Sequence, residues 1–211
     1  MQDKDYFIVT GSNSGLGKNL VKNLNDKGFK TLGIDVVDGE YTDLKFDLSK
    51  LSEENVKEIQ SKLGECKIKS IIHCAAVQKN PDKNFESLTK TFDEVFGVNV
   101  KSIYLLVKLL ETYFQKPSNL CLISSVHSNA TTENNTLYAS SKAALKGVLH
   151  GLTLEKKDEM SIFELVLGAM ESPMLLNSYN KNEIENLKNE LPSKKILTTN
   201  EVASFIIDLI I

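Results

Sequence analysis

The sequence predicts an α/β fold of the Rossmann-like, doubly wound type, with one parallel sheet and helices on both of its faces. Short apolar runs rich in β-branched residues alternate with longer segments of helical periodicity. A glycine-rich loop lies between the first apolar run and the first helical segment. The chain has 211 residues, of which 41% are hydrophobic, which suits a single domain over residues 1–211.

Charge and composition exclude several classes of function. The formal net charge is −3, and acidic and basic residues are interleaved, so no basic block indicates binding to nucleic acid or to an anionic membrane. No apolar run is long enough to span a bilayer, and the N-terminal residues do not resemble a signal peptide. Three cysteines form no CxxC pair and three histidines show no metal-ligand spacing. We therefore expect a cytoplasmic protein with reduced thiols and no metal site.

The first strand, residues 6–10, leads into the pattern Gly11-x-x-x-Gly15-x-Gly17, and a helix follows. Gly11 permits a tight turn, Gly15 lets the backbone approach a pyrophosphate, and Gly17 lets the helix pack closely. Amides at the helix N-terminus can bind the anion. The alternative is an ordinary Gly/Ser/Asn loop. Under the dinucleotide interpretation, the cofactor-binding residues of this loop are Gly11, Asn13, Ser14, Gly15, Leu16 and Gly17.

The second strand, residues 31–35, ends on an acid. Asp35 follows the glycines by about twenty residues, where a carboxylate accepts hydrogen bonds from the adenosine ribose hydroxyls. It would repel a 2′-phosphate, and neither Ser14, Val36 nor Val37 is basic. The sequence therefore favours NAD(H) over NADP(H). The alternative is a carboxylate that only faces water.

A third strand is expected at residues 45–48, after a loop, because about a dozen residues are too few for a crossover helix. Asp47 could accept from an adenine amino group while the Leu48 amide donates to the ring. Asp47 could also begin the turn before a helix capped by Ser52, and the two roles are compatible. The fourth strand, residues 70–74, ends at Cys74-Ala75, where small side chains would let adenosine approach the backbone.

A long helix is expected from about residue 88 to residue 116. Asn99 lies in its middle, where asparagine is not favoured. It is either a tolerated polar residue on the solvent side or a residue that interrupts the helical hydrogen bonds and holds a water. Its apolar neighbours suggest burial, which favours the second interpretation.

The candidate catalytic group follows. Ser125 lies at the carboxyl end of a fifth strand, residues 119–124, and a helix over residues 137–156 carries Tyr138 and Lys142 on one face. A phenol, an ammonium and a hydroxyl that converge above a sheet can move a proton to or from a carbonyl oxygen. A second pair with the same spacing, Tyr104 and Lys108, lacks a strand-end hydroxyl, which indicates a packed or dimer-forming helix.

The C-terminal third contributes a sixth strand, residues 162–167, followed by Gly168. Residues 175–195 are expected to form a helical flap over a pocket through Leu175, Leu176, Tyr179, Ile184 and Leu187. The last helix starts with a capping box, Thr198-x-x-Glu201, and is expected to bury Val202, Phe205, Ile206 and Leu209.

Taken together, these motifs resemble the short-chain dehydrogenase/reductase family over essentially the whole chain. The resemblance implies that Tyr138 is the acid/base and that Lys142 binds the nicotinamide ribose and lowers the phenol pKa. It implies that Ser125 hydrogen-bonds the substrate oxygen and that Asn99 holds a water of a proton relay. The remaining cofactor contacts implied are Gly168, the Met170 backbone and Ser172, beside the nicotinamide.

Three departures from the family pattern stand out. Cys74-Ala-Ala replaces Asn-Ala-Gly, and Leu167 replaces the proline before Gly168. The sequence ends at Ile211 after a helix, where many relatives have a seventh strand. We therefore expect six strands in the order 3-2-1-4-5-6, with the seventh strand and edge-to-edge assembly through it missing.

The expected function is hydride transfer between NAD(H) and a secondary alcohol or ketone. The substrate would be a small molecule enclosed by residues 126–136 and 172–196, and a homodimer would form through the helices at 93–115 and 137–156. One alternative is a nucleotide-sensing binding protein without turnover. Another is a sugar-nucleotide epimerase or dehydratase, although those relatives usually have a longer chain and a different glycine spacing.

Overall fold

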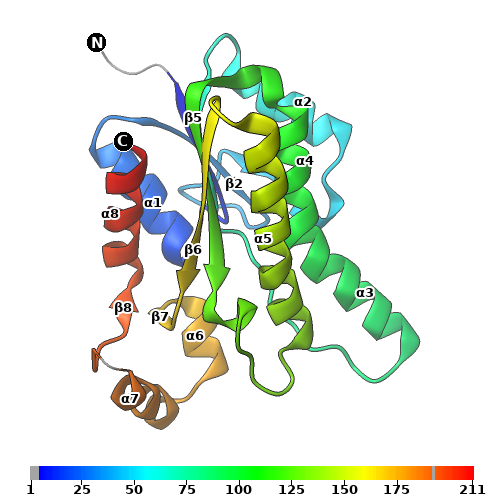
Figure 1. Ribbon diagram of the computed structural model, residues 1–211, viewed down its shortest axis with the longest axis vertical. Coiled ribbons are helices and arrows are strands. Elements are labelled where there is room, and N and C mark those ends of the chain that lie inside the picture. The colour runs from blue at the N-terminus through cyan, green and yellow to red at the C-terminus, as the bar shows by residue number, and fades with distance from the viewer. Residues whose placement is uncertain (1–4, 192) are drawn as a thin grey trace.

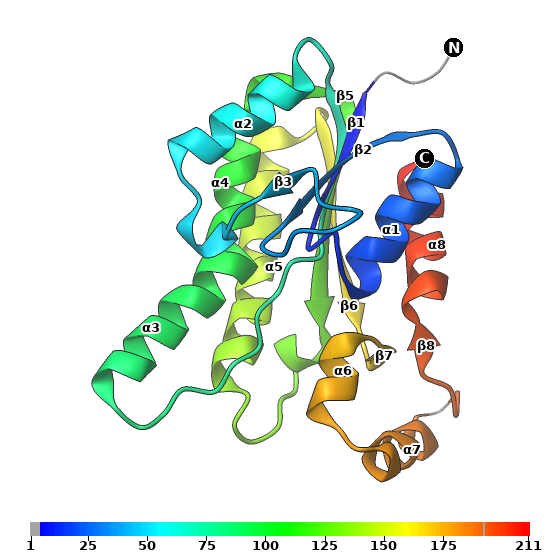
Figure 2. The ribbon, with the colours of Figure 1, turned by 180° about the vertical axis from the view of Figure 1, so that it is seen from behind.

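The computed structural model describes residues 5–191 and 193–211. A six-stranded parallel sheet in the order β3-β2-β1-β4-β5-β6 forms the centre of the molecule, with helices on both faces (Figures 1 and 2). The predicted fold class and strand order are confirmed. A second sheet, made of two short strands, β7 (Met170–Glu171) and β8 (Leu197–Thr198), was not predicted.

The strands of the main sheet are β1 (Tyr6–Thr10), β2 (Lys30–Asp35), β3 (Leu44–Lys45), β4 (Ile68–His73), β5 (Phe114–Ser125) and β6 (Met160–Leu167). The helices are α1 (Gly15–Asp26), α2 (Glu53–Leu63), α3 (Phe85–Phe96), α4 (Ser102–Leu109), α5 (Thr136–Lys156), α6 (Pro173–Ser178), α7 (Lys181–Glu190) and α8 (Thr199–Ile210). Helices α2, α4 and α5 cover one face of the sheet, and α1 and α8 cover the other (Figure 2).

Two hydrophobic cores form because consecutive residues of a strand point to opposite faces. In β1, Ile8 packs into the core under α2, α4 and α5, whereas Phe7 and Val9 pack into the core under α1 and α8. The neighbouring residues Ile71 and Ile72 of β4 divide between the two cores in the same way. The central strands are therefore apolar throughout, as expected of a parallel sheet covered on both sides.

The long helix predicted for residues 88–116 was wrong in its bounds. Helix α3 begins at Phe85, a π-helical turn covers Gly97–Lys101, and α4 ends at Leu109. Phe114 already belongs to β5 and pairs with Ile68 of β4. Pairing in the sheet and burial of Phe114 override the helical propensity of this segment.

The third strand is also shorter than predicted, because β3 ends at Lys45. The Asp47 carboxylate accepts hydrogen bonds from the backbone amide of Ser49 at 2.9 Å and from its hydroxyl at 2.7 Å. Asp47 thereby caps a 3₁₀ turn at Leu48–Lys50. This confirms the predicted turn before α2, which Ser52 caps.

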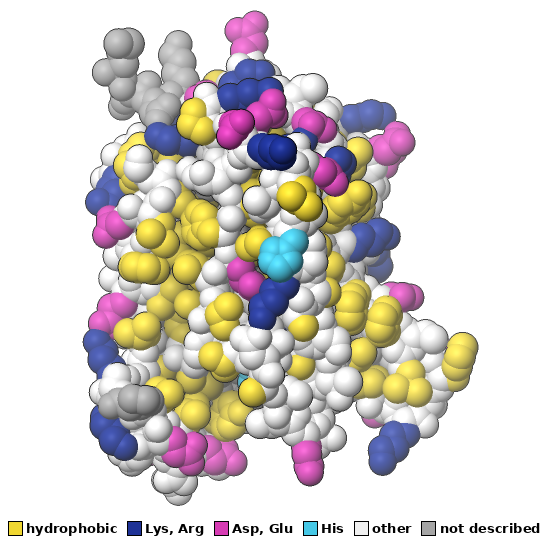
Figure 3. Space-filling model, in the orientation of Figure 1, with side chains coloured by type: hydrophobic (Ala, Val, Ile, Leu, Met, Phe, Trp, Pro, Cys, Tyr) yellow, Lys and Arg dark blue, Asp and Glu magenta, His cyan; other side chains and the backbone are white. Residues whose placement is uncertain are grey.

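Helix α8 begins with the predicted capping box, in which Thr198 and Glu201 accept hydrogen bonds from each other's amides. Val202 and Ile206 are buried as predicted, but Phe205 is 56% exposed and Leu209 is 49% exposed. Successive residues of a helix are rotated by about 100°, so the face of α8 that packs on α1 also includes Ala203, Ile207 and Ile210. Phe205 and Leu209 lie on the opposite, exposed face. Figure 3 shows hydrophobic side chains on the surface beside α8.

Candidate active site

A pocket of about 740 Å³ opens at the carboxyl ends of the strands, where ligands bind in open α/β sheets. Of the predicted site residues, all except Asn13 and Asn99 line it. The structure thus brings the glycine loop, Asp35, the strand ends, the start of α5 and the Gly168 segment into one cleft. Ser125 and Tyr138 share this cleft, as the chemistry inferred from the sequence requires.

The glycine loop is shaped by close backbone contacts. Gly11 has a φ of +68°, and a Cβ atom there would lie 2.8 Å from the backbone nitrogen of Ala75. A Cβ atom on Gly17 would lie 2.0 Å from the Gly11 carbonyl oxygen, so glycine lets α1 begin directly against the loop. Ser14, the residue before α1, makes no side-chain cap, and the first turn has no acidic residue. The helix N-terminus therefore suits an anion.

Asp35 is fixed at the end of β2 by two backbone amides. Its carboxylate accepts hydrogen bonds from Asn13 N at 2.9 Å and from Val37 N at 3.0 Å. Asn13 consequently acts through its backbone, while its side chain donates to the carbonyl of Asp38 at 3.3 Å and does not line the pocket. The carboxylate lies at the pocket with acceptor capacity left for hydroxyl groups.

Tyr138 and Lys142 lie in the first turns of α5, as predicted. The Lys142 ammonium donates a hydrogen bond to the carbonyl of Ile123 at 2.7 Å and lies 5.6 Å from the centre of the Tyr138 ring. Ser125 Oγ accepts a hydrogen bond from His127 N at 3.2 Å, which leaves the Ser125 proton available for donation. A phenol, a cation and a hydroxyl donor therefore share the pocket.

Burial sets the proton affinities of this group. It raises the pKa of Tyr138 above its ordinary value, and the hydrogen bond with Ser125 only partly opposes this effect. The direction is opposite to the expected lowering of the phenol pKa by Lys142. Burial also lowers the pKa of Lys142 to about 8, while the charges of Cys74 and Glu164 act in the other direction.

Asn99 is fully buried within the π-helical turn, so the predicted interruption of the helix is confirmed. Its side chain accepts a hydrogen bond from Val77 N at 2.7 Å, and donates to Val77 O at 3.0 Å and to Ser141 Oγ at 2.8 Å. Asn99 does not line the pocket. It ties the loop after β4 to helix α5, next to Lys142.

The Gly168 segment ends beside the glycine loop, because a Cβ atom on Gly15 would lie 3.8 Å from Ser172 Cβ. Gly168 and Ala169 join β6 to β7, and Ser172 Oγ accepts a hydrogen bond from Leu175 N at 3.3 Å as the cap of α6. Ser172 and Met170 both line the pocket, as does Gly168.

Residues 175–195 form two short helices, α6 and α7. Leu175, Tyr179 and Leu187 line the pocket as predicted. Leu176, which is 60% exposed, and Ile184 do not. Only part of the predicted apolar set therefore contributes to the wall of the pocket.

Gln78 and His127 are polar residues of the pocket that were not singled out from the sequence. Gln78 donates a hydrogen bond to the Asn135 side chain at 2.9 Å, and the His127 ring lies edge-on to Tyr138 with 6.1 Å between ring centres. The sequence position of each of these two residues could have indicated that it lies at the pocket. Gln78 follows the small residues after β4, and His127 follows Ser125 by two residues.

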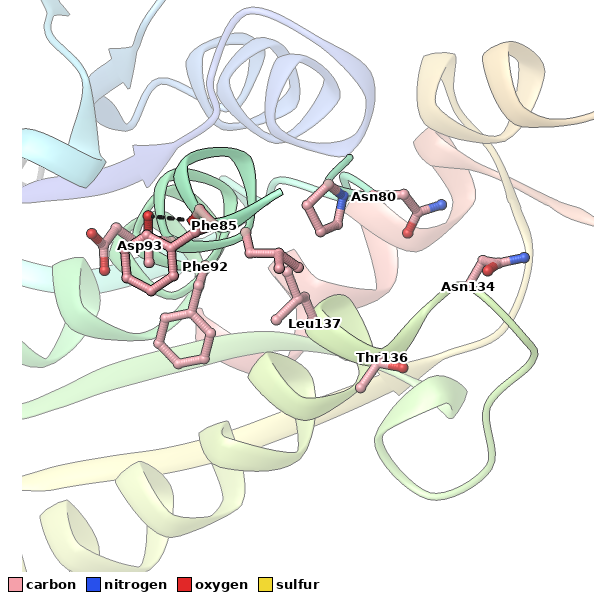
Figure 4. Close-up of a pocket in the computed structure, with 10 residues that line it drawn as sticks. Asn80, Phe85, Phe92, Asp93, Asn134, Thr136 and Leu137 are labelled. Carbon is pink, nitrogen blue, oxygen red and sulfur yellow. Dashed lines mark hydrogen bonds between the residues drawn. The ribbon is translucent and has the colours of Figure 1, made fainter. Parts of the chain in front are cut away.

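A second pocket, of about 710 Å³, lies between α3 and the start of α5. Phe85, Leu88 and Phe92 come from α3, and Thr136 and Leu137 come from α5 (Figure 4). None of the predicted site residues lines it. Its walls are mainly apolar, and no catalytic group meets there among the residues that the structure describes.

Within the described ranges, no group of three or more His, Cys, Asp or Glu residues could hold a metal ion. None of the helices that the structure describes is both long and apolar enough to cross a membrane.

Comparison with known proteins identifies the family. The profile of the short chain dehydrogenase family matches residues 5–183. A 3-oxoacyl-(acyl-carrier-protein) reductase of Buchnera aphidicola is 26% identical over 98% of this chain and 90% of its own. An acetoacetyl-CoA reductase of Synechocystis is also 26% identical, over 96% of this chain and 86% of its own.

Solved structures share the fold. The aldohexose dehydrogenase of Thermoplasma acidophilum superposes with a TM-score of 0.85 at 20% identity, covering 99% of this chain and 88% of that one. The 3-ketoacyl-(acyl-carrier-protein) reductase of Brucella melitensis, solved with NADH, has a TM-score of 0.83 at 22% identity, covering 100% and 92%. With the family profile matching most of its length, this chain belongs to the short-chain dehydrogenase family of oxidoreductases.

Proposed function

We propose that the protein transfers a hydride between NAD(H) and a secondary alcohol or ketone, with Ser125, Tyr138, Lys142 and Asn99 as its catalytic group. The observation that carries this proposal is that Ser125, Tyr138 and Lys142 line the same pocket as the glycine loop and Asp35. Proton transfer and dinucleotide binding would therefore meet in one cleft.

In this mechanism the bound nicotinamide supplies or accepts the hydride. During reduction, Tyr138 donates its phenol proton to the carbonyl oxygen, and Ser125 donates a hydrogen bond to the same oxygen. The Lys142 ammonium would hold the nicotinamide ribose and would stabilise the phenolate by its charge. Because burial raises the pKa of Tyr138, the phenol is protonated and ready to donate at neutral pH.

Two parts of the pocket support the cofactor preference: the N-terminus of α1 and Asp35 at the end of β2. The uncapped N-terminus of α1 and the close approach that Gly11 and Gly17 permit suit the pyrophosphate. Asp35 suits ribose hydroxyls and would repel a 2′-phosphate. The structural neighbour from Brucella melitensis was solved with NADH. These features together favour NAD(H), with Asp47, Leu48, Cys74 and Ala75 near the adenine.

The substrate would lie between residues 126–136 and the segment that carries α6 and α7. The walls there mix the apolar side chains of Leu175 and Leu187 with the polar groups of Gln78 and His127. Two relatives are named as reductases of 3-oxoacyl and acetoacetyl thioesters. Short 3-oxoacyl compounds are therefore the first ketones to test.

Association would be a homodimer through α4 and α5, in the cytoplasm, where the free thiols of the chain stay reduced. These helices carry exposed apolar side chains, with Tyr104 44% exposed and Leu154 72% exposed. Phe85, Leu88 and Phe92, around the second pocket, extend this surface along α3.

The test is Tyr138→Phe, assayed by NADH oxidation with a ketone panel and by NADH fluorescence. We expect turnover to fall at least ~100-fold, because general acid catalysis by the phenol is lost. NADH affinity should stay within about twofold of the original, because a phenyl ring fills the same space. Tyr104→Phe, in the other Tyr-x-x-x-Lys pattern, is the matched control and should change neither quantity.

Two outcomes would contradict the proposal. Full turnover in Tyr138→Phe would remove Tyr138 from the mechanism. NADH binding by the unmodified protein without turnover of any ketone or alcohol would instead support a nucleotide sensor.

A further inference from the structure

His73 is a buried titratable residue that the proposed mechanism does not use. It ends β4, is 0% exposed, and lies between the glycine loop and the π-helical turn that contains Asn99. Its Nδ1 atom is 2.8 Å from Thr10 Oγ1 at the end of β1. The amide of Ala75, in the loop that lines the cofactor pocket, donates to the same Oγ1 at 3.2 Å.

These contacts select one form of the imidazole. Thr10 Oγ1 accepts the Ala75 amide, and an imidazole that accepts the Thr10 proton at Nδ1 gives that proton an acceptor as well. Burial, with the charge of Lys142 adding to it, lowers the pKa of His73 to about 3, so the ring is neutral at pH 7. In a neutral ring that accepts at Nδ1, the proton lies on Nε2.

The Nε2 group faces the π-helical turn. Nε2 is buried and has no hydrogen-bond partner among the described residues, whereas buried donors are normally satisfied by protein or ordered water. The carbonyls of Val98 and Asn99 lie close enough to act on the imidazole. The Val98 carbonyl already accepts a hydrogen bond from Ser102 Oγ at 2.6 Å. A carbonyl oxygen has two lone pairs, so the Val98 and Asn99 carbonyls both remain acceptors for Nε2–H.

We infer that His73 is a positioning residue whose Nε2–H group holds the π-helical turn at the backbone carbonyls of Val98 and Asn99, while its Nδ1 holds Thr10. The imidazole then joins the end of β1 to the π-helical turn. From that turn, the Asn99 side chain holds Val77 of the pocket wall and Ser141 of α5. The π-helical turn thereby fixes the position of the pocket wall relative to α5, the helix that carries Tyr138 and Lys142.

The first test reads the tautomer directly. In the full chain labelled with 15N-histidine, NMR at pH 7 should show His73 as a neutral ring with its proton on Nε2. A ring protonated on Nδ1, or on both nitrogens, would overturn the inference. This measurement depends on neither a cofactor nor a substrate, so it stands apart from the proposed oxidoreductase function.

The second test separates the two nitrogens with a matched pair of variants. His73→Gln places an amide donor near the position of Nε2, whereas His73→Asn keeps a polar group only near Nδ1. Hydrogen exchange of the amides at 97–104 should quicken about tenfold in His73→Asn and stay within about threefold in His73→Gln. Equal exchange in the two variants, whether fast or slow, would overturn the inference, because Nε2 would then have no separate role.

A third reading rests on the proposed function. In the NADH-dependent assay, His73→Asn should lower kcat about tenfold with little change in KM, and His73→Gln should restore most of it. Unchanged kcat in His73→Asn, with turnover established for the original protein, would contradict the positioning role. Absence of turnover in every form would count against the proposed function, and the NMR and exchange results would still decide the inference.

Discussion

At the scale of single residues, Lys142 occupies a position that disfavours its own charge. Its side chain is buried beside the Ile123 carbonyl, and burial lowers its pKa from 10.5 to about 8. Below pH 8 the ammonium is charged in both the folded and unfolded chain, so folding carries a cost of about 3 kcal/mol. Between about pH 8 and 10.5 the unfolded chain binds more protons, and stability rises with pH.

This cost can be measured with Lys142→Met. At pH 7 the variant should be more stable than the original protein by about 2 kcal/mol, since part of the gain is offset by the unpaired Ile123 carbonyl. The difference should shrink as the pH approaches 10, and turnover should be lost. Urea unfolding at several pH values measures the stability difference, and Lys101→Met, at an exposed lysine, is the control. A variant less stable than the original at pH 7 would mean that the ammonium stabilises the fold.

Asp35 is the second residue whose role can be isolated. In Asp35→Ala the carboxylate that repels a 2′-phosphate is gone, so the ratio of NADH to NADPH affinity should fall at least ~10-fold. Fluorescence titration with both nucleotides gives the ratio. Asp38→Ala removes an exposed carboxylate from the same segment and should leave the ratio unchanged. An unchanged ratio in Asp35→Ala would contradict the proposed preference for NAD(H).

At the scale of elements, the junction between the glycine loop and α1 depends on glycine residues, which have no side chain. Gly17→Ala would place a Cβ atom 2.0 Å from the Gly11 carbonyl oxygen, so α1 must shift. NADH affinity should fall at least ~10-fold and the protein should be destabilised, as read by fluorescence titration and urea unfolding.

A glycine in another helix provides the control. Gly151 lies inside α5, and a Cβ atom there would have no neighbour within 4 Å. Gly151→Ala should stabilise the protein by about 0.5–1 kcal/mol and leave NADH affinity unchanged. If Gly17→Ala behaved like Gly151→Ala, the close packing of loop and helix would have no functional role.

The sequence predicted the elements whose signals are local. The glycine loop, the cap at Ser52 and the capping box at Thr198 could be predicted because each depends on residues within a few positions of one another. The π-helical turn at Asn99 was anticipated as an interruption, since a buried asparagine in a helix needs partners. In the loop and the two caps, neighbouring residues determine the structure, whereas the partners of Asn99 are distant in the chain.

What could not be predicted depends on contacts between distant segments. The end of α4 is set by pairing of Phe114 with Ile68, and the outward face of Phe205 is set by how α8 packs on α1. The pKa of Tyr138 depends on how deeply α5 is buried, which the spacing to Lys142 does not contain. His73 belonged to an apolar strand, and its contact with Thr10 joins residues 63 positions apart.

At the scale of the whole molecule, two exposed apolar surfaces compete as places for association. One lies on α4 and α5, where the Lys108–Glu155 ion pair joins the helices at 2.8 Å beside Tyr104 and Leu154. The other lies on α8 and the outer strand β6, where Phe205 and Val166 are exposed (Figure 3). The proposed dimer through α4 and α5 uses the first surface and leaves the second open.

Charge substitutions on each surface decide between them. Leu154→Glu places a charge on the proposed interface and should convert the proposed dimer to a monomer, because an unpaired charge buried between protomers is costly. Phe205→Glu makes the same kind of change on α8 and should leave the dimer intact. Light scattering after size exclusion gives the molecular mass of each variant. Urea unfolding is the control for stability, because substitutions at these exposed sites should change the free energy of unfolding by less than ~0.5 kcal/mol. A dimer that survives Leu154→Glu and dissociates in Phe205→Glu would move the interface to α8 and the open edge of the sheet.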